Sequence, residues 1–327
     1  MIPYTRKTLP NGLTVVVNRD RASKLAAVNI LYRVGARNEN PARTGFAHLF
    51  EHLMFRGTRA VENFDLPVQM ASGDNNAFTN NDYTDFYITL PKDNLETALW
   101  LESDRMEGLD ITPAKLEAEK KVVIEEFRQR YLNQPYGDQT MLLRALAYKV
   151  HPYRWAAIGL ATDHIAGATL ADVESFYRAH YRPSNAILSI SADMEEERML
   201  ELAEKWFAPL ADHPSATAAI PQEPVQTQAR RQEVERDVPA STVTVAYHMC
   251  ARTKPDFYTA DLVSDLLSGG DSGRLYTHLV KERNLLSSVN AYITGDVDPG
   301  LFVFTGQLLP GVTPEAAEAA FREEIEA

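Results

Sequence analysis

The alternation of apolar and polar positions predicts strands and helices in turn along the chain. Pro10-Asn11-Gly12 separates two short apolar-rich stretches, which is typical of a β-hairpin. Residues 26–35 are apolar at nearly every position, which predicts a strand inside a sheet. The same patterns predict strands at 75–81, 83–91 and 186–193, and helices at 45–55, 94–109, 113–133, 136–148, 169–180 and 195–207.

A change of composition divides the chain into two modules. Residues 212–232 are rich in proline, alanine, glutamine and threonine, and we expect them to form a linker. The linker would separate a first module, residues 1–211, from a second module, residues 233–327. In the second module, apolar patterns predict strands at 241–249, 288–294 and 301–308, and helices at 256–268, at 273–285 and from 314 onwards.

The two modules resemble one another in sequence. Residues 28–37 align without gaps on residues 243–252, with identical valine, tyrosine, alanine and arginine residues at equivalent positions. We therefore expect an α+β protein of two homologous α/β sandwich modules, each a mostly antiparallel sheet covered by helices on one face. A second module as long as the first would extend beyond residue 327, which leaves open whether the chain is truncated at its C-terminus.

Composition and charge narrow the classes of function. The chain of 327 residues is 45% hydrophobic and 24% charged, as globular proteins are, and its net charge is −12. Because a phosphate-binding surface needs a basic field, we expect no nucleic-acid partner. No apolar run is long enough to cross a bilayer, and we expect no membrane partner. The N-terminus lacks the pattern of a signal peptide, which favours the cytoplasm, with the periplasm as the alternative if a signal peptide was removed.

The candidate chemistry lies in the stretch HLFEHLMF, residues 48–55. His48 and His52 are four residues apart, so on a helix they share one face and can hold one zinc ion between their rings. Glu51 lies close to that face and can take a proton from a water molecule that zinc makes acidic. The rest of this helix is apolar, so three titratable side chains there need partners or a metal.

A catalytic zinc site requires a third protein ligand. The predicted helix 113–133 offers Glu119 and Glu126, which are seven residues apart and share nearly the same face, flanked by apolar residues. Glu126 is our candidate third ligand, and Glu119 is a candidate for orienting a histidine ring. On the residues alone, the choice between Glu126 and its neighbour Glu125 stays open.

A known family shows the same motifs in the same order. The chain resembles the pitrilysin/insulinase/mitochondrial processing peptidase family, the inverzincins, in the H-x-x-E-H motif and in the segments LPNGLTVVV, GARNENPARTGFAHLFEHLMFRGT, NNAFTNNDYTDFYITLP, EKKVVIEEF and YRPSNAILSISAD. It is most similar to bacterial members of roughly half length, which pair as dimers. The resemblance implies a zinc endopeptidase with His48, His52 and Glu126 as Zn²⁺ ligands, Glu51 as general base and Glu119 as supporting carboxylate.

The resemblance also implies how substrate binds. NNAFTNN resembles the edge strand of the family, to which a peptide adds as an extra strand. The physics agrees, because an edge strand offers unpaired N–H and C=O groups that bind peptide backbone. We expect Asn76, Ala77 and Phe78 to contact the substrate.

The resemblance further implies a partner chain. The family encloses peptides between two halves, and an arginine and a tyrosine from the opposite half help to bind the substrate carbonyl. The stretch where we would look for them, 300–309, contains no arginine. We therefore expect a homodimer, or a heterodimer with a related chain that supplies this pair.

The sequence supports one main hypothesis and one alternative. The main hypothesis is a zinc-dependent endopeptidase that hydrolyses peptides or unfolded segments inside a two-chain chamber. The alternative is a non-catalytic core or binding subunit of a peptidase-like complex. Family members of that sort typically have a broken motif, whereas all five carboxylate and imidazole residues are present here.

Overall fold

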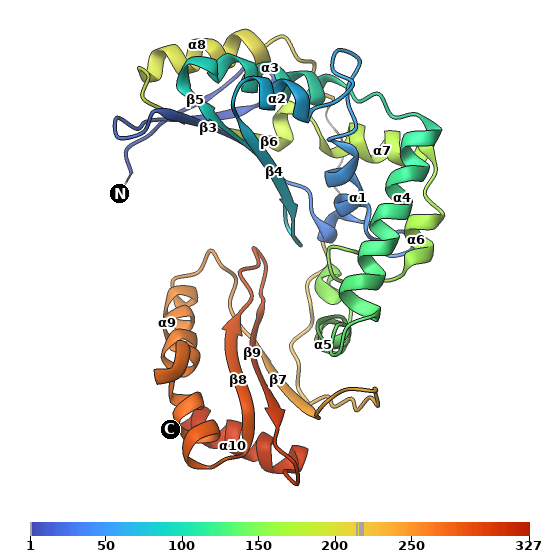
Figure 1. The fold of residues 1–327 in the computed structure, drawn as a ribbon, viewed down its shortest axis with the longest axis vertical. Coiled ribbons are helices and arrows are strands. Elements are labelled where there is room, and N and C mark those ends of the chain that lie inside the picture. The colour runs from blue at the N-terminus through green and yellow to red at the C-terminus, as the bar shows by residue number, and fades with distance from the viewer. Residues whose placement is uncertain (1, 214, 216–218) are drawn as a thin grey trace. The chain divides into compact units, whose positions relative to one another are not determined.

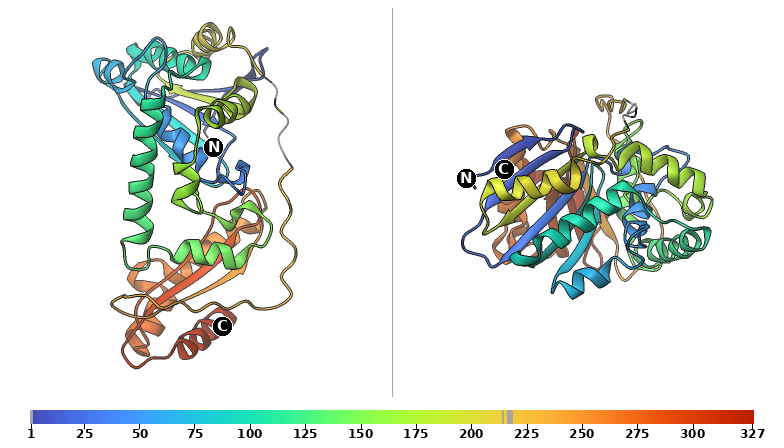
Figure 2. Two further views of the ribbon diagram at one scale, coloured as in Figure 1. Left: turned by 90° about the vertical axis from the view of Figure 1, so that its right-hand side faces the viewer. Right: turned by 90° about the horizontal axis from the view of Figure 1, so that it is seen from above.

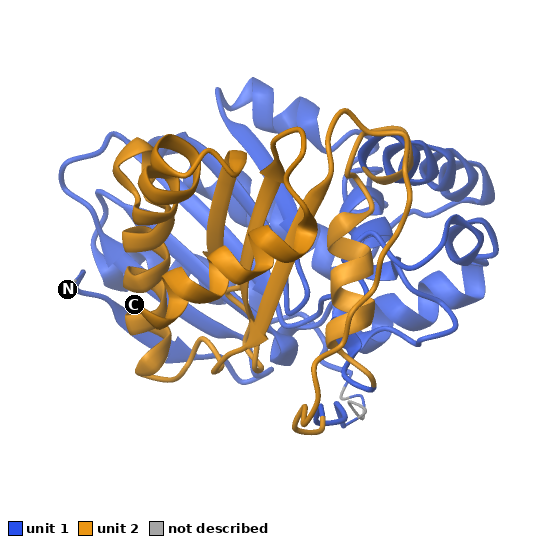
Figure 3. Ribbon diagram, turned by 90° about the horizontal axis from the view of Figure 1, so that it is seen from below, with its two compact units in different colours: residues 1–130, 150–223 blue, residues 131–149, 224–327 orange. Residues whose placement is uncertain are grey.

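Two compact units make up the chain. The computed structural model describes residues 2–213, 215 and 219–327. Met1 and part of the predicted linker 212–232, namely 214 and 216–218, lie outside the described residues. The units, coloured separately in Figure 3, are residues 1–130 with 150–223, and residues 131–149 with 224–327. The segment 131–149 groups with the second unit, although it precedes the predicted linker in the chain.

A six-stranded sheet forms the base of the first unit (Figure 1). Its strands are β1 (Thr5–Thr8), β2 (Thr14–Arg19), β3 (Leu25–Tyr32), β4 (Asp74–Thr79), β5 (Thr84–Pro91) and β6 (Ala186–Ala192). Their order is β1-β2-β6-β3-β5-β4, in which β2 and β6 are parallel and the other neighbours are antiparallel. Strand β3 lies inside the sheet, as its apolar sequence predicts, and β4 lies at an edge.

Helices pack on this sheet and on one another. Those of the first unit are α1 (Phe46–Leu53), α2 (Asp65–Met70), α3 (Leu95–Glu107), α4 (Pro113–Phe127), α6 (Thr162–Ala166), α7 (Leu170–His180) and α8 (Glu196–Phe207). Helix α3 contacts β3 and β5, and α8 contacts β2; Figure 2 shows both lying across the strands. Helix α1 contacts β4 and β5 and packs against α4 and α7. The expected sandwich with a mostly antiparallel sheet is confirmed.

Stacked aromatic rings fasten α1 to the sheet. The ring of Phe50 on α1 stacks on Tyr181 at 5.2 Å between centroids, and Tyr181 in turn lies 4.9 Å from Tyr32 of β3. All three side chains are buried. Such contacts add specific geometry to a large apolar area, so the helix that carries the H-x-x-E-H motif has a defined position over the strands.

Two of the predicted helices differ in their extent. The stretch 113–133 is not one continuous α-helix: α4 ends at Phe127 and the chain continues as a π-helix, Arg128–Leu132. The predicted helix 136–148 starts only at Gln139, as α5 (Gln139–Ala147). Tyr136 has a positive φ of 63°, which an L-residue does not adopt inside a helix, so the chain turns there before α5 begins.

A smaller sheet organises the second unit, with strands β7 (Thr242–His248), β8 (Leu286–Ile293) and β9 (Leu301–Leu308). All neighbours are antiparallel in the order β7-β9-β8, which repeats the order β3-β5-β4 of the first unit. Helices α9 (Asp256–Ser268) and α10 (Pro314–Glu326) lie where helices are predicted. The predicted helix 273–285 is instead a 3₁₀ turn, Gly270–Ser272, followed by a π-helix, Tyr276–Glu282. The repeat inferred from sequence is therefore visible in the strand order.

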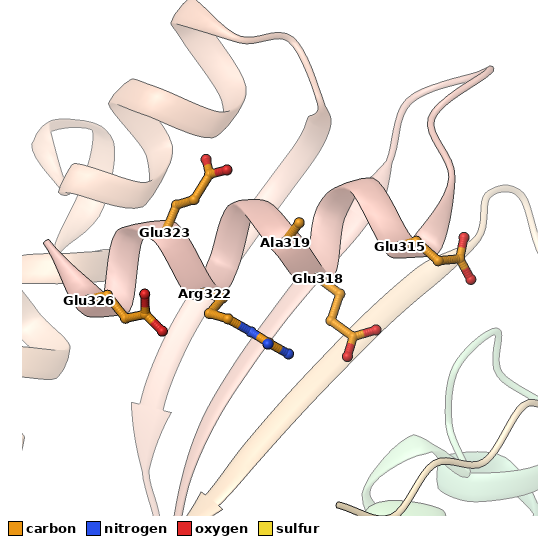
Figure 4. A pocket seen from close by; sticks show the side chains of 6 residues that line it. All are labelled: Glu315, Glu318, Ala319, Arg322, Glu323 and Glu326. Carbon is orange, nitrogen blue, oxygen red and sulfur yellow. The ribbon is translucent and has the colours of Figure 1, made fainter.

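A shallow hollow of about 350 Å³ runs along α10 (Figure 4). Its lining consists of Glu315, Glu318, Ala319, Arg322, Glu323 and Glu326. Two of these carboxylates, Glu315 and Glu318, pair with the guanidinium of Arg231. Charged side chains on an open helix face are typical of a solvated surface, and we assign no site to this hollow.

Long apolar helices of the kind that cross a bilayer do not occur in the described part of the chain.

The N-terminus of α1 is held by a buried carboxylate. Gly45, the N-cap, has a φ of 88°, and a Cβ there would lie 2.7 Å from the carbonyl oxygen of Ile158, so only glycine fits. The two oxygens of Glu39 accept hydrogen bonds from the backbone N–H groups of Gly45 and Ala47, both at 2.9 Å. Glu39 thus satisfies donors that a helix leaves free at its first turn.

A buried ion pair lies within α3. Arg105 donates through Nε and Nη2 to the two oxygens of Glu102, at 2.7 and 2.6 Å. The guanidinium also lies over the rings of Phe64 and Phe86, at 4.4 and 4.1 Å from their centroids. Both charged side chains are almost completely buried, so each depends on the other for compensation of its charge.

Removal of one partner of this pair is expected to destabilise the first unit. We expect Arg105→Met to lower the free energy of unfolding by about 3–5 kcal/mol, because it leaves a buried carboxylate without its counter-charge. The double variant Glu102→Leu/Arg105→Met should recover much of this loss in urea unfolding. Arg198→Met is the control, since Arg198 pairs with Glu201 at the same helical spacing on an exposed surface. Equal losses in the single and the double variant would contradict the role of the pair.

Titration of Glu39 is expected to make stability depend on pH. Burial raises the pKa of Glu39 from 4.5 to about 8, although the N–H donors of α1 act in the opposite direction. Since the pKa is higher in the folded chain, the stability that Glu39 contributes is present below pH 4.5 and is lost as the pH rises through about 8. We expect Glu39→Gln to abolish this loss in urea unfolding between about pH 5 and 8. The exposed Glu62→Gln should behave as wild type, and identical pH profiles for Glu39→Gln and wild type would refute the prediction.

Candidate metal centre

Helix α1 presents its polar residues to α4. Its Leu49, Phe50 and Leu53 are completely buried in the core, whereas His48 and His52 lie on the remaining side. The centroids of the two imidazole rings are 4.8 Å apart, as expected for residues separated by four positions on one helix. Apolar packing of one side of α1 therefore directs both histidines toward its neighbour α4.

Helix α4 supplies carboxylates to the same place. It begins at Pro113 after the N-cap Thr112, whose hydroxyl accepts a hydrogen bond from the N–H of Lys115 at 3.2 Å. Glu126 points to the histidines, and 17% of its side chain is exposed. The side chain of Glu125 is instead 53% exposed, and its Oε2 lies 3.7 Å from Nη1 of Arg128. The packing thus distinguishes two neighbouring glutamates that the residue pattern alone does not.

Three potential ligand atoms converge between the helices. Oε2 of Glu126 lies 3.6 Å from Nε2 of His48 and 3.3 Å from Nε2 of His52. The ligand atoms of these three residues all lie within 4.8 Å of one another. Nδ1 of His48 is buried and forms no hydrogen bond within the described residues, so the polar contacts of this ring run through Nε2. The structure therefore brings His48, His52 and Glu126 together.

The two histidines differ in protonation. Burial lowers the pKa of His48 to about 4, and the neighbouring His52 acts in the same direction, although Glu126 opposes both. Burial also lowers the pKa of His52, but hydrogen bonds with Glu119 and Glu126 more than offset this and raise it to about 9. Near neutral pH, His48 is thus in the neutral form that binds metals, whereas His52 must release a proton to do so.

Glu51 lies beside this group and faces the sheet. Its carboxylate takes part in a hydrogen bond with the side chain of Thr79, the last residue of β4. Burial raises the pKa of Glu51, which the hydrogen bond with Thr79 and the nearby His52 partly counteract. A carboxylate with a raised pKa is suited to take up and release protons near neutral pH.

Glu119 is the second carboxylate of α4 near the histidines. Its side chain is only 2% exposed, and its Oε2 lies 3.5 Å from Nδ1 of His52. Burial raises the pKa of Glu119, but the contacts with His52 and Arg56 lower it by a larger amount. The net shift of this pKa is therefore downward. Glu119 therefore meets the ring nitrogen of His52 that faces away from Glu126.

Two arginines near the site were not singled out from the sequence. Nε of Arg56 lies 2.6 Å from Oε1 of Glu119, and Nη1 of Arg130 lies 2.9 Å from Oε1 of Glu126. Arg130 follows Glu126 by four residues, so helical spacing was a usable signal for this pair. Arg56 and its partner Glu119 belong to different segments of the chain, and no spacing in the sequence indicates their contact.

The strand β4 has one side free for another strand. Within the described chain its only neighbour is β5, where Ala77 pairs with Phe86. The N–H of Ala77 donates to the side-chain oxygen of Asn76 at 2.9 Å, so it faces the open edge and not β5. Phe78 is 44% exposed, and its ring lies 5.8 Å from that of Tyr83. Asn76, Ala77 and Phe78 therefore lie along an accessible edge that ends at Thr79 beside Glu51.

Comparison with known proteins identifies related sequences for both units. Residues 14–155 match the family model described as insulinase (peptidase family M16), and residues 167–327 match that of the peptidase M16 inactive domain. The chain is 33% identical to the zinc protease PqqE of Helicobacter pylori, over 95% of this chain and 71% of that protein. It is 26% identical to a probable β subunit of the mitochondrial-processing peptidase of Arabidopsis thaliana, of which it covers 59%.

A solved structure shows the same fold over the whole chain. The crystal structure of a protease from Helicobacter pylori superposes with a TM-score of 0.95 at 31% identity, over 100% of this chain and 80% of that one. The expected relationship, drawn from the H-x-x-E-H motif and the order of the segments, is thereby confirmed. The chain belongs to the M16 family of peptidases, the insulinase family.

Proposed function

We propose that this protein is a zinc-dependent endopeptidase whose zinc ligands are His48, His52 and Glu126. The observation that carries the proposal is the convergence of their ligand atoms within 4.8 Å of one another. The names of the relatives, which include zinc proteases, support a peptidase function. The match of residues 167–327 to an inactive domain is consistent with this. Continued without gaps, the alignment of 28–37 on 243–252 places Val263, Leu266 and Leu267 at the positions of His48, Glu51 and His52.

The donor set and its spacing fit zinc. Two imidazole nitrogens and one carboxylate oxygen form a set typical of catalytic zinc sites, which keep a fourth position open. Ligand atoms about 2.0–2.1 Å from one tetrahedral ion lie about 3.4 Å apart. The two separations between Glu126 and the histidines, 3.6 and 3.3 Å, bracket this value. The three ligand atoms all lie within 4.8 Å of one another, so His48, His52 and Glu126 are the residues that would hold the ion.

Glu51 is proposed as the general base. A zinc ion held by the three ligands would act as a Lewis acid and lower the pKa of a water molecule. The water could then lose a proton near neutral pH and attack a carbonyl. Glu51 would accept the proton of the attacking water at its carboxylate oxygen and then pass it to the nitrogen of the leaving amine. Its raised pKa and its place between the histidines and β4 support both transfers.

The edge of β4 is proposed to bind the peptide. An extended segment would add to it as a further strand, with Asn76 and Ala77 contacting its backbone and Phe78 one of its side chains. The N–H of Ala77 faces the open edge and supports this proposal. A bound peptide would replace the side-chain oxygen of Asn76 as the acceptor of this N–H. Because such a site recognises backbone, it suits peptides and unfolded segments and excludes folded ones.

A partner chain is proposed to complete the enzyme. This chain would pair as a homodimer, or as a heterodimer with a related chain, to enclose the substrate and supply an arginine and a tyrosine for its carbonyl. One relative is named as a subunit, a probable β subunit of the mitochondrial-processing peptidase. This name supports an assembly of more than one chain.

We propose the cytoplasm as the compartment of this protein, with the periplasm as the alternative.

The proposal is tested by measuring bound zinc and cleavage of a quenched, unstructured peptide in parallel. We expect wild type to hold one zinc per chain and to cleave. Glu51→Gln should hold the same zinc but lose about 10²–10⁴-fold in kcat, the range for a lost acid–base group. Glu126→Gln should lose zinc, whereas its exposed neighbour Glu125→Gln should behave as wild type.

The assay is run on the chain alone and with a candidate partner. Activity that appears only with the partner supports the two-chain enzyme. Absence of zinc from wild type after careful reconstitution would refute the enzyme and favour the alternative, a non-catalytic binding subunit.

The substrate strand is tested by Ala77→Pro. Proline removes the N–H that faces the open edge and leaves the pairing of β4 with β5 intact. Loss of one backbone hydrogen bond is worth about 0.5–1.5 kcal/mol, so we expect kcat/KM to fall up to about tenfold. Zinc content and the unfolding midpoint, measured on the same sample, should stay at wild-type values. An unchanged kcat/KM would place the peptide elsewhere.

A further inference from the structure

Arg56 forms an asymmetric ion pair near the proposed centre. It lies just beyond the C-terminal end of α1, and 51% of its side chain is exposed, whereas its partner Glu119 is only 2% exposed. Nε of Arg56 lies 2.6 Å from Oε1 of Glu119. An exposed arginine thus extends inward to a carboxylate that solvent does not reach.

The pair continues to a proposed zinc ligand. The second oxygen of Glu119, Oε2, lies 3.5 Å from Nδ1 of His52. It is buried and forms no hydrogen bond within the described residues, so its contact with His52 is that of an ion pair. The opposite ring nitrogen, Nε2 of His52, lies 3.3 Å from Oε2 of Glu126. Arg56, Glu119 and His52 therefore form a continuous series of contacts that ends at the ligand atoms.

We propose that Arg56 is a positioning residue, which holds the carboxylate of Glu119 so that Oε2 orients the ring of His52 toward zinc. The inference rests on the proposed zinc site. With Oε1 engaged by Arg56, the carboxylate cannot rotate freely about its last bond, and Oε2 stays directed at Nδ1. A ring fixed through Nδ1 presents Nε2 in one orientation, which is how groups behind a metal ligand raise its affinity.

The position of Arg56 differs from that of Arg130. Arg130 is 67% exposed and contacts Glu126, a proposed ligand, directly at 2.9 Å. Arg56 instead acts on a carboxylate that is not a ligand, and it reaches that carboxylate through Nε, an atom that lysine lacks. A lysine would supply the charge without the planar donor group, so the two residues are not equivalent here.

The inference is tested by zinc affinity, measured by competition with a chromophoric chelator. We expect Arg56→Gln to weaken zinc binding about tenfold, the lower end of the range for groups behind a ligand. Arg56→Lys should recover part of this loss. The control is Arg59→Gln, because Arg59 is exposed and forms no ion pair with the described residues.

A double-variant cycle separates positioning from a merely structural role. If Arg56 acts through Glu119, Arg56→Gln should weaken zinc binding no further in a Glu119→Gln background. The visible absorption bands of bound cobalt, which report ligand geometry, should shift in Arg56→Gln and not in Arg59→Gln. Unfolding midpoints of the zinc-free variants identify any loss of folding.

The outcomes distinguish this inference from the proposed function. Wild type that binds zinc, with Arg56→Gln binding it equally well, would overturn the role of Arg56 and leave the zinc site intact. Additive losses in the double variant would show that Arg56 does not act through Glu119 and would overturn it as well. Wild type that binds no zinc would remove the proposed function and this inference with it.

Discussion

The packing of α1 against α4 is the interaction on which the candidate site depends. It brings two imidazole rings to two largely buried carboxylates, which costs free energy unless the charges are compensated. Each carboxylate is compensated on both oxygens. Glu119 meets Arg56 on one oxygen and His52 on the other, and Glu126 meets Arg130 on one and both histidines on the other. The arginines thus occupy the outer oxygens, and the inner oxygens remain directed at the imidazole rings.

The two helices differ in how firmly they are held. Helix α1 is fixed at its N-terminus by Glu39 and along its length by the aromatic stack on Phe50. Helix α4 keeps regular geometry as far as Phe127, and the next residues form a π-helix. Single π-turns are frequent at functional sites because they change the direction of side chains locally. Here the change begins at Arg128, two residues after Glu126, and includes Arg130, the residue that contacts the outer oxygen of Glu126.

The contact between Glu51 and Thr79 connects the proposed chemistry with the proposed substrate strand. Thr79 is the last residue of β4, so a peptide paired with that edge would pass close to the carboxylate of Glu51. The side-chain oxygen of Asn76 meanwhile accepts a hydrogen bond from the N–H of Ala77. This contact satisfies a donor that an edge strand otherwise exposes to other chains, and a bound peptide can replace it.

Local pattern determined a large part of this protein. The periods of apolar residues predicted the main strands and helices, the repeated module and the common face of His48 and His52, because these depend only on neighbours in the chain. The short helices α2 and α6, the π-helix after Phe127 and the late start of α5 depend on turns and packing, and the pattern missed them. The preference for Glu126 over Glu125 came from family resemblance, not from spacing. Only the tertiary structure decided which glutamate faces the histidines and that Arg56 supports them through Glu119, because these contacts depend on the rotation of one helix against another and join residues far apart in sequence.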